Sequence, residues 1–265
     1  MAVAPEPAPA APERPRVASP LPLHEPLWTY VLLGVNGLVW LAMTLSGGSE
    51  SVEVLVRFGA KFNPYIALRG EYWRLVTPMF LHIGLMHLAF NSYALLAFGR
   101  DVESLFGRSR FLALYLLSGV GGAVASFVGN DAISAGASGA VFGLVGAMVV
   151  YLLIYRNVFG QWGRQWLTNL LVVVALNLAL GFAGAGIDNL GHIGGLLAGL
   201  ALGWVYCPRY RPAPPETPWD PPRLVDGYSR TRAWLASLAL LAALVALTYL
   251  GALRWAAVYS GLGGL

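Results

Sequence analysis

Charged side chains are scarce in this chain of 265 residues. They make up 11% of the sequence, whereas hydrophobic residues make up 57%. A soluble domain usually carries about 25% charged residues, so this chain has too few to cover a globule in water. The mean hydropathy of +0.62 favours a membrane protein instead. A chain of this length can form one polytopic domain without being divided into two.

Cysteine and lysine are almost absent as well. The single cysteine, Cys207, excludes an internal disulfide and a multi-cysteine metal site, and its role is open. There is one lysine beside sixteen arginines. Because the arginines are scattered between apolar runs, the net charge of +4 indicates signals of membrane topology and not a nucleic-acid-binding patch. We therefore expect no nucleic-acid partner.

Composition changes along the chain predict four regions. Residues 1–26 form a Pro/Ala-rich tail that cannot bury a core, so we expect it to be disordered and cytoplasmic. The tail has no apolar stretch behind a basic start, and a signal peptide is not expected there. A helical core over 27–206 is followed by an Arg- and Pro-rich cytoplasmic connector, 207–232, and a last helix within 233–265.

Seven apolar runs predict the fold class. Each is close to the roughly 20 residues that a helix needs to span the hydrocarbon layer. The runs lie near residues 27–46, 79–99, 110–128, 137–155, 166–183, 190–206 and 233–253. The sequence therefore predicts an all-α, polytopic membrane helix bundle with a six-helix core and a seventh, C-terminal transmembrane helix.

The positions of the basic residues predict the orientation. If the N-terminal tail is cytoplasmic, the inner segments hold twelve Arg residues and the outer segments hold five Arg or Lys residues. The positive-inside rule then places the N-terminus in the cytoplasm and the C-terminus outside. Low Lys with abundant Ala, Arg and Gly further suggests the inner membrane of a bacterium.

Two motifs place a serine and a histidine at the same ends of two hydrophobic helices. Ser138 opens the fourth run and His192 lies near the start of the sixth, so the predicted orientation puts both near the outer face. A neutral histidine can take the proton of a serine hydroxyl, which is otherwise a weak nucleophile. The alternative is helix packing, since small residues with Ser are common between membrane helices and Gly191, Gly195 and Gly199 form a GxxxG face.

The second run contains three further polar side chains, His82, His87 and Asn91. His87 and Asn91 are four residues apart and share a helical face. In lipid they need partners or a water-filled cavity, so a structural hydrogen-bond cluster is one interpretation. A zinc site is another, but there is no HExxH motif and no carboxylate nearby in a helix. We expect no metal and no cofactor.

Taken together, these motifs resemble those of the rhomboid intramembrane serine proteases. The resemblance covers roughly residues 27–206 and rests on four motifs, each specific only in combination with the others. They are Trp73-Arg74 before the second helix, HxxxxHxxxN at 82–91, GASG at 136–139 and GHxGG at 191–195. The helix beyond the connector matches a six-plus-one arrangement of the family.

The resemblance implies roles for individual residues. Ser138 would be the nucleophile and His192 the general base, while His87, Asn91 and the Ser138 N–H would line the oxyanion site. Gly136 and Gly139 would support the active site. Phe142 stands where many members have a Tyr that packs on the catalytic histidine, and an aromatic ring can still orient an imidazole there. Asp188 is close to His192 in sequence but lies in the outer loop, so a Ser–His dyad is implied. Trp73-Arg74 would belong to a loop partly embedded in the outer leaflet.

The function implied is hydrolysis of peptide bonds in or near single-pass transmembrane segments of membrane-anchored proteins, with membrane lipid as surroundings. A catalytically silent relative that binds and retains membrane helices is the alternative, although such proteins typically lack the Ser or the His. A channel or transporter would be favoured by further intramembrane charges or inverted repeats, which the sequence lacks. Substrate identity and oligomeric state are not indicated by the sequence.

Overall fold

The computed structural model describes residue 21 and residues 23–184, 186–214 and 223–262. Most of the tail that we predicted to be disordered therefore lies outside the described residues. The chain divides into two units. One is a helical body formed by residues 23–208 and 228–265, and the other includes a β-hairpin within residues 209–227.

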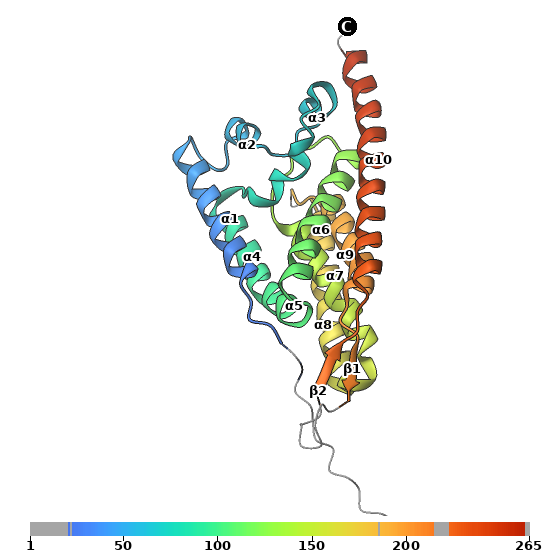
Figure 1. Ribbon diagram of the computed structural model, residues 1–265. Coiled ribbons are helices and arrows are strands. Elements are labelled where there is room, and N and C mark those ends of the chain that lie inside the picture. Colours follow the sequence, from blue (N-terminus) through green and yellow to red (C-terminus); the bar gives the residue numbers. More distant parts are fainter. Residues whose placement is uncertain (1–20, 22, 185, 215–222, 263–265) are drawn as a thin grey trace, which may run out of the picture. The chain divides into compact units, whose positions relative to one another are not determined.

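The helical body consists of α-helices joined by short connections (Figure 1). The α-helices are α1 (Trp28–Leu45), α2 (Val52–Phe58), α3 (Asn63–Arg69), α4 (Gly84–Ala94), α5 (Arg100–Phe106), α6 (Arg108–Gly129), α7 (Ser138–Ile154), α8 (Arg156–Phe182), α9 (Asn189–Tyr206) and α10 (Arg230–Leu262). Two 3-10 turns, Tyr72–Leu75 and Thr77–Phe80, precede α4, and a π-helical turn, Leu95–Gly99, joins α4 to α5.

The long helices follow the seven apolar runs and confirm the predicted fold class. By length and composition α1, α6, α8 and α10 can each cross a membrane, and α7 is a shorter apolar helix. α4 and the π-helical turn continue into one another over the second run, and α5 follows directly after it. α9 covers the sixth run. The hydrophobic runs therefore predicted where the helices lie, because an apolar stretch of this length is satisfied in lipid only as a helix.

The start of the second helix was predicted wrongly. The apolar run begins near residue 79, but Met79 belongs to a 3-10 turn, and α4 begins at Gly84. Pro78 lies in that turn, and Gly84 has a φ of +74° that side chains other than glycine rarely adopt. His82 consequently precedes the helix that carries His87, whereas the motif placed both on one helix.

The fifth helix also differs from its apolar run. α8 begins ten residues before the run that starts near residue 166, so the expected connector is helical. Gly160 has φ 54° and ψ −128° and breaks the regular helix. Within α8 only Gly163 and Leu170 are buried, so this helix is the least embedded of the long ones.

The core is built from α6, α7 and α9, which approach each other through glycines. Every residue of α7 from Ala140 to Leu152 is buried. A Cβ on Gly195 would collide with the carbonyl oxygen of Gly139, and one on Gly199 with that of Gly143. Helix packing was one interpretation of the small-residue face, and its glycines do lie in a helix contact that brings α9 directly against α7.

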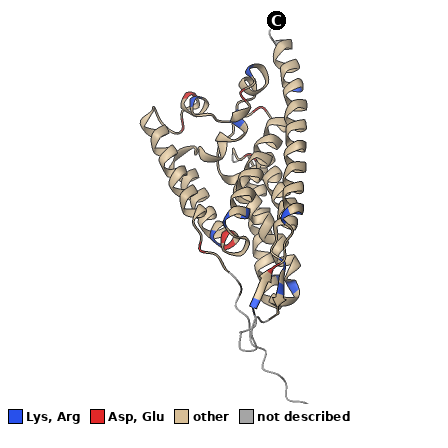
Figure 2. Ribbon diagram, in the orientation of Figure 1, with Lys and Arg blue, Asp and Glu red and all other residues tan. Residues whose placement is uncertain are grey.

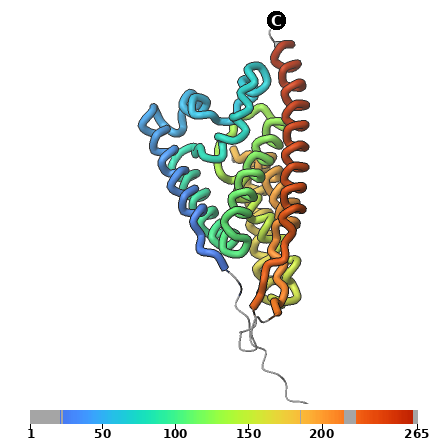
Figure 3. Tube along the Cα trace, in the orientation of Figure 1, coloured from blue at the N-terminus to red at the C-terminus, as the bar shows by residue number. Residues whose placement is uncertain are grey.

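Within the helical body, α1 and α10 run in the same direction, and α2 and α3 lie at the end where both helices finish (Figures 1 and 3). Figure 2 shows that Lys, Arg, Asp and Glu gather near the ends of the long helices, whose middle turns lack them. This distribution is the one expected for a bundle that spans a hydrocarbon layer.

The second unit contains strands β1 (Tyr210–Ala213) and β2 (Arg223–Asp226), which pair antiparallel. The Arg209 N–H donates to Asp226 Oδ1 over 2.8 Å, and the Gly227 N–H donates to the Arg209 carbonyl over 3.0 Å. These two bonds join the residue before β1 to the last residue of β2 and to the residue after it. The sequence did not predict strands in this Pro-rich connector.

Candidate active site

Ser138 is the first residue of α7, and the turn before it depends on a glycine. Gly136 has a φ of +138°, and its N–H donates to the Pro78 carbonyl over 2.9 Å. In the described chain no side chain caps the N-terminus of α7. The N–H groups at that end, including that of Ser138, are therefore donors without a helical partner.

His192 lies in the first turn of α9, at a depth that brings its ring to Ser138. The distance from His192 Nε2 to Ser138 Oγ is 2.8 Å, which is a hydrogen bond. Two features set this distance: α9 and α7 touch through Gly195 and Gly139, and both side chains leave the N-terminal turns of their helices. The two residues that the sequence paired are thus in contact.

Phe142 lies one turn beyond Ser138 and stacks on His192. The ring centroids are 4.3 Å apart and the planes are inclined by 13°. His192 is 5% exposed, and among the described residues nothing accepts a hydrogen bond from its Nδ1. An aromatic face and not a carboxylate thus lies against the imidazole.

His87 faces the turn that carries the serine. A Cβ on Gly136 would lie 2.8 Å from His87 Nε2 and 3.7 Å from Ser138 Oγ, so Gly136 separates the two side chains. The Ile83 N–H lies 3.3 Å from His87 Nδ1 and donates to it. If Nδ1 accepts, the proton of the neutral ring is on Nε2, which makes His87 a hydrogen-bond donor beside Ser138.

Asn91 is placed differently from His87. Its Nδ2 donates to the His87 carbonyl over 2.9 Å, one turn back along α4. The side chain is buried, and the bond uses one of its two N–H groups. Asn91 therefore braces the helix that carries His87, and one donor of its amide remains.

His82 is fully buried, and its ring meets His87 edge-on with centroids 5.4 Å apart. Among the described residues no group of three or more His, Cys, Asp or Glu side chains could hold a metal ion. The two histidines thus pack on each other beside the serine turn, and His82 shapes the position of His87.

Trp73 and Arg74 lie in the loop region between α3 and α4. Arg74 is buried, with Nε 2.6 Å from Glu71 Oε2 and Nη1 2.7 Å from the Val56 carbonyl. The Trp73 ring is about half exposed and packs beside the Arg74 guanidinium and Gly59. Arg74 ties α2 to the 3-10 turn that precedes α4, and neither residue belongs to the contact between Ser138 and His192.

Four polar residues that the sequence did not assign to the site form a ring of hydrogen bonds beside it. Lys61 Nζ lies 3.1 Å from Asn130 Oδ1, and Asn130 Nδ2 lies 3.5 Å from Asp188 Oδ1. Ser134 Oγ donates to Asp188 Oδ2 over 2.6 Å. The backbones of Ser134 and Lys61 then exchange two bonds, of 2.9 and 3.2 Å. The one signal in the sequence was the presence of a single lysine in a predicted outer segment.

The charges in this ring affect each other. Burial lowers the pKa of Lys61 to about 8, although Asp188 and Asp131 act in the opposite direction. Burial alone would raise the pKa of Asp188, but the nearby Ser126 hydroxyl, hydrogen bonds from Ser134 and the Gly191 N–H, and the charge of Lys61 hold that pKa below its ordinary value. Asp188 therefore remains an anion beside the start of α9.

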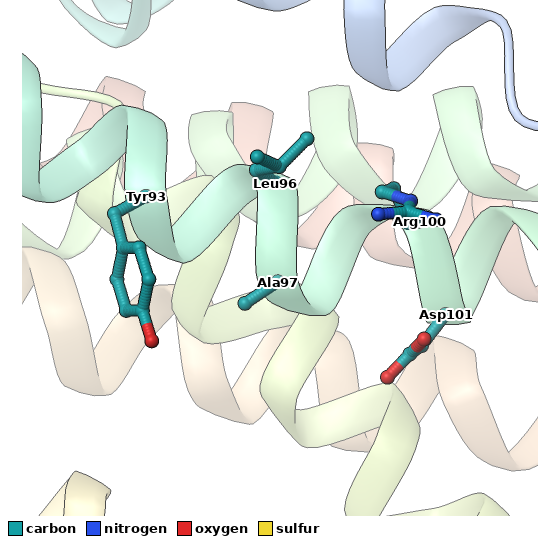
Figure 4. A pocket seen from close by; sticks show the side chains of 5 residues that line it. All are labelled: Tyr93, Leu96, Ala97, Arg100 and Asp101. Carbon is teal, nitrogen blue, oxygen red and sulfur yellow. The ribbon is translucent and has the colours of Figure 1, made fainter.

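A separate pocket of about 290 Å³ lies along the α4–α5 segment. It is lined by Tyr93, Leu96, Ala97, Arg100 and Asp101. Figure 4 shows Tyr93, Ala97 and Asp101 pointing to the same side of the helical segment. None of these residues belongs to the Ser138–His192 pair, and the geometry assigns the pocket no chemistry.

The sequence of residues 69–209 matches the family model described as "Rhomboid domain", which covers more than half of the chain. The chain is also similar to "Rhomboid protease GluP" of Bacillus subtilis (strain 168), with 47% identity over 175 residues. It is 37% identical over 171 residues to "RHOMBOID-like protein 6, mitochondrial" of Arabidopsis thaliana. With "Rhomboid-like protease 1" of Toxoplasma gondii it shares 34% identity over 173 residues.

These similarities cover parts of each protein. The aligned region is 66% of this chain and 34% of GluP, and 64% of this chain and 53% of the Arabidopsis protein. For the Toxoplasma protein the shares are 64% and 58%. The chain thus spans between about a third and three fifths of the length of these relatives.

Proposed function

The chain belongs to the rhomboid family of membrane proteins, and from that premise we propose that it is an intramembrane serine endopeptidase. Its nucleophile is Ser138 and its general base is His192. The proposal is supported by the family model, by relatives whose names call them proteases, and by the geometry around α7 and α9.

One observation carries the proposal. Ser138 Oγ is 2.8 Å from His192 Nε2 inside a helical membrane bundle, and the histidine ring stacks on the ring of Phe142. Helix packing alone explains the glycines between α7 and α9, but it does not require an ionisable side chain. An ionisable side chain at membrane depth is costly, so its presence there favours a functional role.

The reaction follows from this pair in two steps. His192 Nε2 takes the hydroxyl proton while Ser138 Oγ attacks the carbonyl carbon of the peptide bond, and the proton then passes to the leaving amine. The product is an ester on Ser138. A water molecule then attacks the ester carbon, and His192 takes a proton from that water. The proton returns to Ser138 Oγ as the bond between Oγ and the carbonyl carbon breaks and the carboxylic acid product leaves.

The negative charge of each tetrahedral intermediate needs hydrogen-bond donors that are already in place. The Ser138 N–H, at the uncapped start of α7, supplies one. His87 Nε2 supplies another from the opposite side of Gly136. The free N–H of Asn91 is a third donor, after a modest rotation of its amide, because its present bond is to the His87 carbonyl.

The position of Ser138 within a membrane helix bundle limits the class of substrate that can reach it. Hydrolysis consumes water, so a polar cavity must connect Ser138 to one face of the membrane. A peptide bond within a helix has its carbonyl already hydrogen-bonded, and the substrate segment must unwind before attack. We therefore propose single-pass transmembrane proteins as substrates, cleaved where Gly, Pro or small residues weaken the helix near the membrane boundary.

The proposed location is the inner membrane of a bacterium, with the N-terminus cytoplasmic and Leu265 outside. The support is the excess of arginine in the predicted inner segments. Under this orientation, the α1 and α10 ends that adjoin α2 and α3 face outward, and cleavage occurs on that side of the membrane.

Cleavage by purified protein in liposomes tests the proposal. The assay uses a fluorogenic single-pass transmembrane peptide with a Gly-containing segment, and the matched control is Ser138→Ala protein reconstituted in the same lipid. Wild-type protein should cleave the peptide and the variant should not. If wild-type protein binds the peptide without cleaving it, a non-catalytic protein that retains membrane helices replaces the proposal.

A further inference from the structure

Three outer loops of the helical body are joined by the ring of Lys61, Asn130, Ser134 and Asp188. Lys61 lies between α2 and α3, and Asn130 and Ser134 lie between α6 and α7. Asp188 is the residue before α9. The ring closes on itself through side chains in three contacts and through the paired backbones of Lys61 and Ser134 in the fourth.

Two members of the ring lead directly into the reactive pair. Ser134 is four residues before Ser138, and only the Gly136 turn lies between it and α7. Asp188 is four residues before His192, and its carbonyl accepts the His192 N–H over 3.0 Å. The hydrogen bond between Ser134 and Asp188 therefore joins the chain segment that sets the serine to the segment that sets the histidine.

Asp188 also caps the helix that carries His192. Its Oδ1 accepts the Gly191 N–H over 2.9 Å, and a carboxylate at a helix N-terminus interacts favourably with the helix dipole. Both oxygens of Asp188 are thus used: Oδ1 accepts from Gly191 and, over 3.5 Å, from Asn130, and Oδ2 accepts from Ser134. Loss of the Asp188 carboxylate therefore releases the cap of α9 and the contacts to Ser134 and Asn130 at once.

Lys61 holds the other side of the ring. Its side chain is fully buried, and Nζ lies 3.2 Å from the Asn130 carbonyl and 3.5 Å from the Ser126 carbonyl. These carbonyls belong to the end of α6, where a cation is favoured by the helix dipole. The lysine therefore anchors the loop that contains Asn130 and Ser134 to the end of α6.

We propose that Asp188 is a positioning residue for proteolysis, which holds Ser138 and His192 at reacting distance through its bonds to Ser134 and Gly191. The inference rests on the proposed function. Asp188 does not act as a third catalytic group, because its oxygens bond elsewhere and the His192 ring nitrogen Nδ1 has no partner among the described residues. A displacement of about 1 Å in such a pair can lower the rate roughly 10²-fold.

Three variants test the inference in the liposome assay. Asp188→Ala removes the bonds to Gly191 and Ser134, together with the longer one to Asn130. It should lower kcat roughly 10²-fold, with KM within about threefold, because Asp188 does not meet the substrate. Asp188→Asn keeps an acceptor for the Gly191 N–H and a polar partner for Ser134, so it should restore kcat to within about tenfold of wild type. Asp131→Asn, the matched control, removes an exposed carboxylate from the loop that contains Ser134 and should leave kcat unchanged.

The inference is overturned if Asp188→Ala protein retains wild-type kcat. It is also overturned if Asp188→Asn loses as much kcat as Asp188→Ala, since negative charge and not hydrogen bonding would then be what matters. A wild-type protein that cleaves, with an inactive Ser138→Ala variant, shows in the same experiment that the proposed function itself stands.

Hydrogen exchange gives a second measurement that does not depend on cleavage. The amides of residues 189–192 should exchange at least about tenfold faster in Asp188→Ala than in wild type, because the first turn of α9 loses its cap. The Asp131→Asn control should exchange like wild type. Equal exchange in Asp188→Ala and wild type would overturn the positioning role even if the protein proved not to be a protease.

Discussion

Phe142 and His192 lie face to face, with ring centroids 4.3 Å apart and planes only 13° from parallel. Phe142 is one helical turn beyond Ser138 on α7, so a single helix presents both the hydroxyl and the surface on which the His192 ring rests. The sequence pattern implied this contact, and the distance shows that the missing tyrosine hydroxyl is not needed for stacking.

Replacement of Phe142 by Leu should lower kcat about 2- to 10-fold, which corresponds to the roughly 0.5–1.5 kcal/mol of an aromatic pair. Leu fills similar space but offers no flat face to the imidazole. Phe142→Tyr keeps the ring and serves as the matched control, with kcat close to wild type. Equal rates for all three proteins would mean that the stack does not orient His192.

Replacement of His87 by Ala should lower kcat about 10²- to 10³-fold without abolishing cleavage, as expected when one oxyanion donor is lost. Asn91→Ala should also lower the rate, by a smaller factor, because its amide bonds to the His87 carbonyl in the resting structure. Initial rates in detergent and in liposomes check both variants. Unchanged rates in both media would remove these residues from the oxyanion site.

Glu103 should be a major contributor to stability. Its buried carboxylate accepts the N–H groups of Leu27, Trp28 and Thr29 and the Thr29 hydroxyl, each over 2.8 Å, at the start of α1. Glu103→Ala leaves these donors unpaired, so the free energy of unfolding should fall by roughly 3 kcal/mol or more.

Thermal unfolding in detergent measures the effect of Glu103→Ala. The control is Glu53→Gln, a substitution at an exposed residue in the first turn of α2, which should lower the melting temperature far less because only an exposed charge near a helix N-terminus is lost. If both variants unfolded at the same temperature as wild type, the Glu103 cap on α1 would contribute nothing to stability.

Lys61 should make stability depend on alkaline pH. Its pKa is lowered to about 8 in the folded protein and is about 10.4 in an unfolded chain. Between these values the unfolded state binds more protons, so the stability of wild type relative to Lys61→Met should rise as the pH increases from 8 to 10. Melting temperatures of both proteins at pH 7, 8.5 and 10 check the sign. A difference that is constant or shrinks toward pH 10 contradicts the burial of a lysine with lowered pKa.

The apolar runs predicted the helical bundle, because a hydrophobic run in lipid has few structural options. The motifs paired Ser138 with His192 and His192 with Phe142, and the side chains of both pairs are in contact. Local backbone chemistry was harder to predict. The second helix begins at Gly84 and not near residue 79, since a proline-containing 3-10 turn precedes it. The kink at Gly160 likewise depends on a single glycine conformation.

The polar ring was beyond the reach of a single sequence for a different reason. Lys61, Asn130 and Asp188 are separated by more than fifty residues at each step, and nothing in their spacing predicts that they meet. Asp188 was assigned to an outer loop, and the structure makes it the cap of α9. Contacts between loops depend on how the helices pack, which periodicity does not determine.

Covalent labelling of Ser138 tests the central claim most directly. Purified protein in liposomes is treated with a fluorophosphonate, and the modified peptide is identified and timed by mass spectrometry. The account predicts that Ser138 is labelled in wild type, that Ser134 is not, and that His192→Ala slows labelling by roughly 10³-fold, because the hydroxyl loses its base. Labelling of Ser138 at the same rate in His192→Ala, or cleavage activity that survives Ser138→Ala, would contradict it.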